Sequence, residues 1–248
     1  MHQFAFYTPV VSSIVERGLR EDIYEITEPE LVHRISSVLR LNKGDTIILF
    51  DTHYHSVASI LGIQPKKSIA VEIHAVEANV PLTPSITWLL PLLKREAFEE
   101  ALYTLVELGV HVVQPVLTRK TSKVWWSEKE VGRSRKIMIA AAEQSKQFIF
   151  PLVMPLIPLD IWLAKPQNPR TIKLFFDPLG NPLKTVLSSL EETVVEEIIG
   201  FAGPEGDLTK EEKDALIHQS FIFCKLTSTV LRAQQALTIG LGALRSLL

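Results

Sequence analysis

Residues 198–212 read IIGFAGPEGDLTKEE, and the prediction of the fold starts from this stretch. Ile198–Ala202 is mostly apolar, as in a strand that is buried on both faces. Thr209 and Glu212 form a capping-box pattern, which predicts the start of a helix. We call Gly203–Asp207, between strand and helix, the glycine loop. Because ligands of α/β sheets bind outside the carboxyl ends of strands, the glycine loop is a candidate binding loop, although an ordinary strand-to-helix turn explains the pattern equally well.

Strand and helix patterns alternate on both sides of this stretch. Short apolar runs predict strands, and apolar residues that recur every three or four positions predict helices. The expected strands are Ile86–Leu90, Val110–Val116, Ile172–Phe176 and Phe221–Cys224, and the expected helices are Glu96–Gly109, Ser127–Gln147 and Val230–Leu248. Such alternation is typical of an α/β fold with a mainly parallel sheet and helices on both faces.

The chain before Val80–Pro84 has a different pattern. Residues 1–77 contain β-branched runs at Thr46–Phe50, Ser56–Leu61 and Ile69–Ile73, and a helical pattern at 30–41 with Leu31, Ile35, Val38 and Leu39 on one face. These runs predict a small β-barrel with one helix packed on it. Proline biases its neighbours towards extended backbone, so Val80–Pro84 is expected to be a linker.

Composition favours a folded protein of a reducing compartment. The hydrophobic fraction is 46%, and the single cysteine, Cys224, excludes an intramolecular disulfide. Met1–Phe4 lacks the basic region and apolar run of a signal peptide, so a cytoplasmic location is expected. The apolar stretch Phe148–Ala164 contains three prolines and Asp160, which predicts a buried strand and loop rather than a membrane span.

Charge is distributed unevenly along a chain whose net charge is only −2. Residues 119–136 contain seven Lys or Arg against two Glu, whereas residues 177–214 contain ten acids against three Lys. A protein that is almost neutral overall can therefore present one basic face to nucleic acid. On composition alone, two solvated helical faces are the favoured alternative.

A second candidate loop, Leu226–Arg232, also lies between an expected strand and an expected helix. We call it the threonine loop, from its sequence LTSTVLR. Its hydroxyls and backbone amides can face the same pocket as the glycine loop, because both loops follow strands. Arg232 is expected in the first turn of the last helix, where a cation opposes the helix dipole and requires an anionic partner. A surface arginine paired with a nearby glutamate is the simpler alternative.

Two further groups of residues are candidates for nucleic-acid contact. The basic stretch 119–126 ends in Trp125 and Trp126, which can stack on bases, although packing inside the protein is the favoured alternative for both tryptophans. His33 and Arg40 are seven residues apart, about two helical turns, and are therefore expected to share a face. That face can contact RNA phosphates, or it can be merely solvated.

Several common motifs are absent from the sequence. It contains no GxGxxG dinucleotide loop, no GxxxxGK[ST] phosphate loop and no GxSxG nucleophile elbow. His53 and His55 are the only histidines close together, which is too few for a zinc site, so no metal is expected.

The order of these motifs resembles that of a known family. The shared segments are His33 with Val38–Arg40, Lys94–Arg95, Glu107–Val110, Ala141–Ser145, Gly203–Gly206 and Val230–Arg232. Each segment is weak by itself, but the order is specific and covers essentially the whole chain. On these segments the chain resembles the ribosomal RNA small subunit methyltransferase E family of the SPOUT superfamily.

The resemblance implies a fold, an activity and partners. It implies a PUA-like RNA-binding barrel over residues 1–77 and a SPOUT domain over residues 78–248, whose parallel sheet forms a trefoil knot. It also implies a homodimer, S-adenosyl-L-methionine as cofactor, and methylation of N3 of a uridine in small-subunit ribosomal RNA, either free or in the assembled subunit. No membrane partner is implied.

Roles can also be expected for individual residues. Because Arg232 lies beside the expected cofactor loop, we hypothesise that it is the catalytic residue, which stabilises the developing uracil anion or orients the base, while water and Glu205 are the candidate general bases. The expected cofactor-binding residues are Phe176, Ala202, Gly203, Pro204, Glu205, Gly206, Leu226, Thr227, Thr229, Val230 and Leu231. The expected RNA-binding residues are His33, Arg34, Arg40, Lys94, Arg95, Arg119, Lys123 and Gln144.

Three positions depart from the pattern of the family. Asp207 stands where the family usually has the last glycine of GPEGG, and Thr227 replaces the glycine of an LG pair. Gln234 replaces a carboxylate, and an amide cannot accept a proton as a base does. These departures leave open an alternative of another class, a non-catalytic RNA-binding or ribosome assembly factor on the same scaffold.

Overall fold

A computed structural model describes residues 3–16, 23–189 and 195–247 of the chain. Contacts divide the chain into two compact units. The first unit is Met1–Val80 with Ala142–Ile149, and the second is Pro81–Ala141 with Phe150–Leu248. The chain therefore leaves the second unit for eight residues and then returns to it.

The first unit is built on a five-stranded sheet in the order β1-β3-β4-β5-β2. Its strands are β1 (Phe4–Tyr7), β2 (Ile23–Ile26), β3 (Thr46–Phe50), β4 (Tyr54–Gln64) and β5 (Ser68–Ala78). The three predicted strands are confirmed, and two of them are longer than expected. Side chains of β4 alternate between buried and half-buried over much of its length, so one face of the sheet covers the apolar core. A short helix, α1 (Val10–Glu16), follows β1.

The predicted closed barrel is not confirmed. Strands β1 and β2 lie at the two ends of the sheet order, and among the described residues no strand pairing joins them. Pairing is parallel between β1 and β3 and antiparallel in the rest of this sheet.

The helix expected at 30–41 changes its winding partway along. It begins as α2 (Pro29–His33) and continues as the π-helix η1 (Arg34–Val38), in which the amide of Leu39 donates to the carbonyl of Arg34, five residues back. The wider turn moves Val38 off the buried face, so its expected core position is wrong and it is 62% exposed. Arg40 has φ 54° and lies outside the helix, so the expected common face of His33 and Arg40 is also wrong.

The second unit contains a seven-stranded sheet in which every pairing is parallel. The order is β12-β10-β11-β6-β7-β8, with β9 also paired to β7. Its strands are β6 (Ser85–Pro91), β7 (Val112–Leu117), β8 (Leu152–Val153), β9 (Ile157–Pro158), β10 (Ile172–Pro182), β11 (Glu197–Ala202) and β12 (Ile222–Lys225). The predicted parallel sheet of an α/β fold is confirmed, while the knot stays a prediction.

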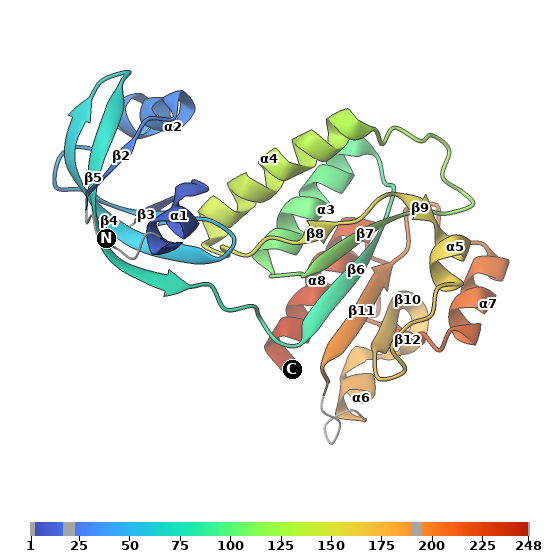
Figure 1. The fold of residues 1–248 in the computed structure, drawn as a ribbon. Coiled ribbons are helices and arrows are strands. Elements are labelled where there is room, and N and C mark those ends of the chain that lie inside the picture. The colour runs from blue at the N-terminus through green and yellow to red at the C-terminus, as the bar shows by residue number, and fades with distance from the viewer. Residues whose placement is uncertain (1–2, 17–22, 190–194, 248) are drawn as a thin grey trace. The chain divides into compact units, whose positions relative to one another are not determined.

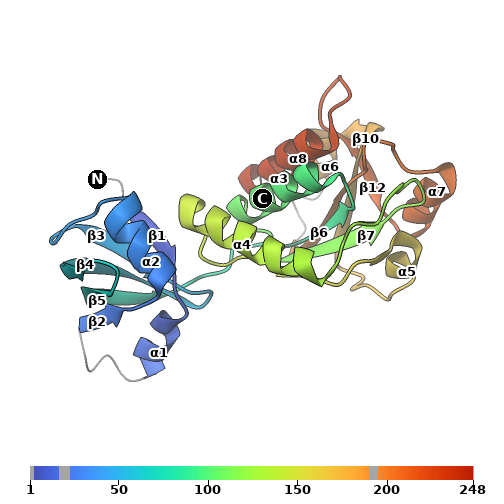
Figure 2. The ribbon, with the colours of Figure 1, turned by 90° about the horizontal axis from the view of Figure 1, so that it is seen from above.

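Helices cover both faces of this sheet (Figures 1 and 2). They are α3 (Arg95–Glu107), α4 (Glu128–Ser145), α5 (Leu159–Leu163), α6 (Leu183–Ser188), α7 (Lys210–His218) and α8 (Ala233–Leu247). Neighbouring strand residues point to opposite faces. Phe175 packs in a core with residues of α5 and α7, whereas Phe176 lies close to Gly240 of α8.

The helix predictions are confirmed with shifted ends. Gly109 follows α3 with φ 66°, the left-handed conformation expected of a glycine at a helix end. Thr209 and Glu212 form the predicted capping box of α7. Helix α8 begins at Ala233, three positions later than expected, so Arg232 precedes the helix instead of lying in its first turn.

The apolar stretch Phe148–Ala164 differs from the prediction of one buried strand and loop. It contains two strands of two residues each and the five-residue helix α5, and Leu152 is 63% exposed. Its prolines lack the amide hydrogens that a longer ladder requires. Among residues 3–16, 23–189 and 195–247, no helix has the length and apolar character needed to cross a membrane.

Candidate functional site

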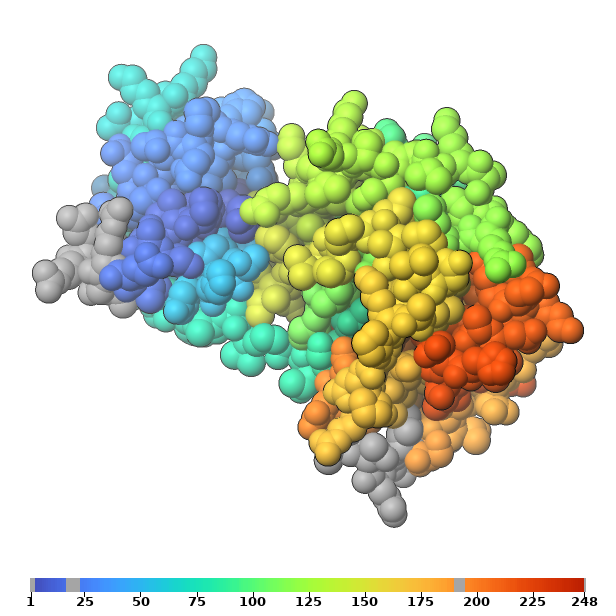
Figure 3. All heavy atoms as spheres, turned by 45° about the vertical axis from the view of Figure 1, so that its right-hand side comes forward, coloured from blue at the N-terminus to red at the C-terminus, as the bar shows by residue number. Residues whose placement is uncertain are grey.

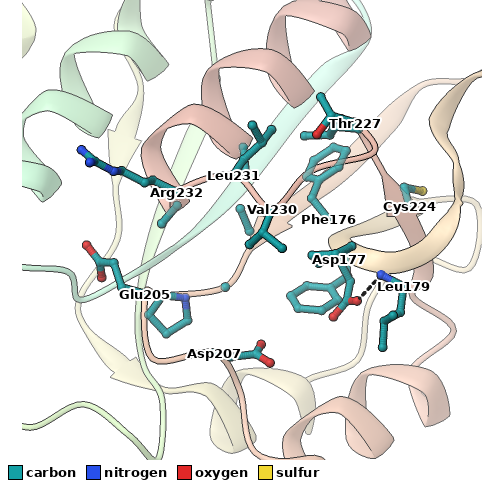
Figure 4. Close-up of a pocket in the computed structure, with 18 of the residues that line it drawn as sticks. Phe176, Asp177, Leu179, Glu205, Asp207, Cys224, Thr227, Val230, Leu231 and Arg232 are labelled. Atoms are coloured by element: carbon teal, nitrogen blue, oxygen red, sulfur yellow. Dashed lines mark hydrogen bonds between the residues drawn. The ribbon is translucent and has the colours of Figure 1, made fainter.

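The glycine loop and the threonine loop meet at one cavity of about 560 Å³ (Figure 4). The glycine loop follows β11 and the threonine loop follows β12, and β10 lies between these two strands in the sheet. Parallel strands end at the same edge of a sheet, so the two loops converge there together with residues of β10. The volume is within the usual range for small-molecule sites, roughly 300–1,000 Å³.

Ten of the eleven residues expected to bind cofactor line this cavity. They are Phe176, Ala202, Gly203, Pro204, Glu205, Leu226, Thr227, Thr229, Val230 and Leu231. Gly206 is not among the lining residues, and the side chain of Lys120 lies beside it. The predicted convergence of the two loops is therefore observed, while binding of the cofactor by these residues stays a prediction.

An irregularity in β10 shapes the cavity beside the two loops. The pairing of β10 with β12 shifts register between Phe176 and Asn181, so the intervening residues bulge from the ladder. Gly180 permits a close approach of the chains there, because a Cβ atom at this position would lie 2.4 Å from the carbonyl carbon of Phe223. Asp177 and Leu179 of the bulge line the cavity, and Leu179 is 93% exposed.

Sequence reasoning missed a charged cluster in the cavity wall. Nζ of Lys213 in α7 donates to Oδ2 of Asp177 at 2.7 Å and to Oδ2 of Asp207 at 2.8 Å. Burial lowers the pKa of Lys213, but the two carboxylates outweigh burial and the pKa is raised above its ordinary value. Asp177 is buried, and its Oδ1 accepts from the amide of Leu179.

One part of this cluster had a signal in the sequence. Asp177 directly follows the predicted strand Ile172–Phe176, and the carboxyl end of a strand is where polar ligand-binding side chains are expected. Lys213 had no such signal, because its contact with Asp207 depends on the backbone conformation of Asp207. Asp207 has φ 56°, a conformation that glycine favours and aspartate tolerates, and its carboxylate bonds Lys213.

The wall formed by Phe176 is held from two sides. Its ring stacks on Trp88 with centroids 5.8 Å apart, and a Cβ atom on Gly240 of α8 would lie 2.9 Å from it.

Cys224 also lines the cavity, and burial raises the pKa of its thiol to about 12. The thiol is therefore protonated at neutral pH and is a poor nucleophile.

Arg232 lies at the cavity, as predicted, but without the expected anionic partner. Its side chain is exposed, and within the described residues no carboxylate lies within 4.0 Å of its guanidinium. The backbone amide of Arg232 donates to Oε1 of Gln235, which caps the start of α8. The guanidinium is therefore free to meet an anionic ligand.

The expected RNA-binding residues lie outside the cavity lining. In the second unit, Lys94, Arg119 and Lys123 are exposed, and Arg95 forms an ion pair of 2.6 Å with the buried Glu130. Trp125 and Trp126 pack against Phe98 of α3, which fits the packing alternative.

In the first unit, His33, Arg40 and Gln144 are exposed, whereas Arg34 is half-buried. Both terminal nitrogens of Arg34 bond the carboxylate of Glu143, the shorter contact being 2.6 Å. The bond to Glu143 raises the pKa of Arg34 despite its burial. Across the described part of the chain, no cluster of three or more His, Cys, Asp or Glu side chains is arranged to hold a metal ion.

Comparison with known proteins gives a consistent result. Residues 81–245 match a family model described as an RNA methyltransferase domain. The ribosomal RNA small subunit methyltransferase E of Synechocystis sp. is 29% identical over 88% of this chain and 71% of that protein. The protein of the same name from Rickettsia conorii is 27% identical over 90% of this chain and 89% of that protein.

Solved structures show the same fold. The ribosomal RNA small subunit methyltransferase E of Neisseria gonorrhoeae, bound to S-adenosyl methionine, superimposes with a TM-score of 0.81 at 23% identity, covering 99% of this chain and 98% of that chain. A putative methyltransferase from Legionella pneumophila, in complex with the same cofactor, gives a TM-score of 0.80 at 23% identity and the same coverage.

Proposed function

The chain belongs to the RNA methyltransferase domain family, of the ribosomal RNA small subunit methyltransferase E type, and from this membership we propose that it methylates small-subunit ribosomal RNA with S-adenosylmethionine as methyl donor. The observation that carries the proposal is the meeting of the glycine and threonine loops at one cavity. Two relatives of the same fold bind this cofactor at 23% identity, which supports the choice of donor.

The residues of the cavity fit this cofactor. Ala202, Val230 and Leu231 offer apolar surface to an adenine ring, and the backbone at Gly203 offers polar groups without an obstructing side chain. Glu205 supplies negative charge to a wall that would face a cation, whereas the charge of Asp177 is compensated by Lys213. Bound there, the cofactor would supply an electrophilic methyl group on a sulfonium.

We propose N3 of a uridine as the acceptor atom. Formation of the N3–methyl bond requires loss of the N3 proton, because the neutral imide nitrogen is a weak nucleophile. Arg232, exposed and without an ion-pair partner in the described chain, would stabilise the negative charge that develops on the uracil carbonyl oxygens. The proton would pass to Glu205, which also lines the cavity, or to water.

The remaining parts of the proposal concern partners. The first unit, with its mixed sheet, would serve as a PUA-like RNA-binding domain, with His33, Arg34, Arg40 and Gln144 near RNA. Lys94, Arg95, Arg119 and Lys123 would contact RNA from the second unit. We further propose a trefoil-knotted SPOUT homodimer that acts in the cytoplasm without a metal.

Mapping of the modified nucleotide tests the proposed methylation. Small-subunit RNA from cells with and without the gene is digested and mapped by mass spectrometry, and one methylated uridine should be present only with the gene. Incubation of the purified protein with labelled cofactor and either free RNA or assembled subunits then identifies the substrate form. Binding of RNA without binding of cofactor in calorimetry would instead support the non-catalytic factor.

A further inference from the structure

The side chain of Lys120 reaches the glycine loop from outside the cavity. Its Nζ donates to the carbonyl oxygen of Gly206 at 2.9 Å and to that of Leu208 at 3.3 Å. Its aliphatic stem lies along Gly206, since a Cβ atom built there would be 3.9 Å from Cβ and Cδ of Lys120. Lys120 does not itself line the cavity. It therefore contacts the outer side of a loop whose inner side faces the candidate ligand site.

The residues next to Lys120 are also tied to the start of α7. The amide of Arg119 donates to Oε1 of Glu212 at 2.8 Å, and Oε2 of the same buried carboxylate accepts from the amide of Thr209 in the capping box. Figure 3 shows this green segment meeting the orange glycine-loop and α7 region on one face of the molecule. Hydrogen bonds thus connect the turn after β7 to the glycine loop after β11 and to the start of α7.

The glycine loop has a second attachment on its inner side. Lys213 bonds the carboxylate of Asp207 and links it to Asp177 of the core strand. The loop is consequently held by one lysine on each side. Of the two lysines, Lys120 is the one that bonds backbone carbonyl oxygens, so it acts on the main chain directly.

We propose that Lys120 is a positioning residue that holds the glycine loop in the conformation that receives the cofactor. This inference rests on the proposed function, because it assumes that the loop binds S-adenosylmethionine. A loop that is already ordered loses less conformational entropy when a ligand binds. Removal of the ammonium should therefore weaken cofactor affinity and raise KM, while kcat at saturating cofactor changes little, since Lys120 does not touch the reacting atoms.

The test compares four forms of the full-length protein by titration calorimetry with S-adenosylmethionine. Lys120→Met keeps the aliphatic stem and removes the ammonium, and it should raise Kd by roughly three- to tenfold, the usual effect of losing a charged hydrogen bond at a partly exposed site. Lys120→Arg keeps a cationic donor and should restore most of the affinity. Lys165→Ala, at an exposed position of the same unit and outside the cavity lining, should match the wild type.

Hydrogen exchange of the cofactor-free protein gives a second readout. Amides of residues 203 and 205–209 should exchange faster in Lys120→Met than in the wild type, whereas amides of β6 should not change. Equal Kd values together with equal exchange in this loop would overturn the inference. If the wild type itself does not bind the cofactor, the proposed function fails, and the exchange comparison still decides whether Lys120 orders the loop.

Discussion

The ammonium of Lys213 lies 2.7 Å from a carboxylate oxygen of Asp177, and this ion pair joins the first turn of α7 to strand β10. The side chain of Asp177 is only 3% exposed, and its carboxylate is bonded by this ammonium and by the amide of Leu179. An isolated charge in such a place is costly, because it is removed from water without compensation.

Replacement of Lys213 by Met should therefore destabilise the protein. We expect a loss of about 1–3 kcal/mol in the free energy of unfolding, measured with urea, since one buried carboxylate loses its counter-charge. Lys210→Met, at an exposed position of the same helix, is the matched control and should change stability little. Combining Lys213→Met with Asp177→Asn should recover part of the loss, and a fully additive double variant would contradict the pairing.

Arg245 of α8 bonds backbone carbonyl groups just before strand β6 and just after helix α3. Its guanidinium donates to the carbonyl oxygens of Pro84 at 2.8 Å, Leu108 at 3.0 Å and Gly109 at 2.5 Å. Arg245→Ala leaves these three acceptors without their donor, so we expect a loss of about 2–4 kcal/mol.

Arg245→Lys should lie between the wild type and Arg245→Ala, because an ammonium cannot reach three carbonyl groups in the fork geometry of guanidinium. Thermal unfolding with Arg170→Ala, an exposed arginine of the same unit, provides the comparison. A melting temperature of Arg245→Ala within one degree of that of Arg170→Ala would show that the three hydrogen bonds contribute nothing measurable.

His111 should make stability depend on pH. Burial, together with the nearby charge of Arg245, lowers the pKa of His111 below its ordinary value, although a backbone hydrogen bond to Leu82 opposes the shift. Its Nδ1 accepts from the amide of Ile86, which requires the neutral ring. The unfolded chain thus takes up the proton at higher pH than the folded chain does, and stability falls as the pH drops below about 6.5.

Urea unfolding at pH 7.5 and pH 5.5 measures this loss. His111→Gln removes the titrating group and should reduce the difference between the two pH values, whereas His218→Gln, at an exposed position, should keep the full difference. An unchanged pH dependence in His111→Gln would assign the effect to other groups.

Much of the parallel sheet and the cavity could be predicted because their signals are local. The run Ile198–Ala202 and the capping box at Thr209 lie next to each other, and together they place the glycine loop at a strand end. The same rule placed the threonine loop after Cys224, so the meeting of the two loops followed from the parallel arrangement of the strands.

What could not be predicted depends on contacts between distant residues or on backbone winding. Arg34 and Glu143 are 109 positions apart, and neither side chain shows by itself that it will be paired. The π-helical turn that exposes Val38 has no periodic signature, because the residues around it fit an ordinary helix equally well. The register shift at Gly180 depends on the approach of β12, which no short window of sequence contains.

Arg232 provides the most direct test of the proposed chemistry. It lies at the cavity beside Leu231 with an exposed guanidinium, and among the described residues no carboxylate neutralises it. If Arg232 stabilises the uracil anion, Arg232→Ala should lower kcat on small-subunit RNA by roughly 10²-fold, as the loss of one anion-stabilising donor does elsewhere. The Kd for S-adenosylmethionine should change much less, because the charge develops on the RNA base.

Arg232→Lys distinguishes the contribution of positive charge to kcat from that of the forked donor geometry. It retains the positive charge but not the forked donor, so a partial recovery of kcat would indicate that charge is the larger contribution, while no recovery would indicate orientation of the base. Measured at two pH values, Arg232→Ala should lose less activity at high pH, where more of the uridine is already deprotonated and less anion stabilisation is needed. Turnover equal to that of the wild type at both pH values would remove Arg232 from the mechanism and leave Glu205 and water as the groups to examine.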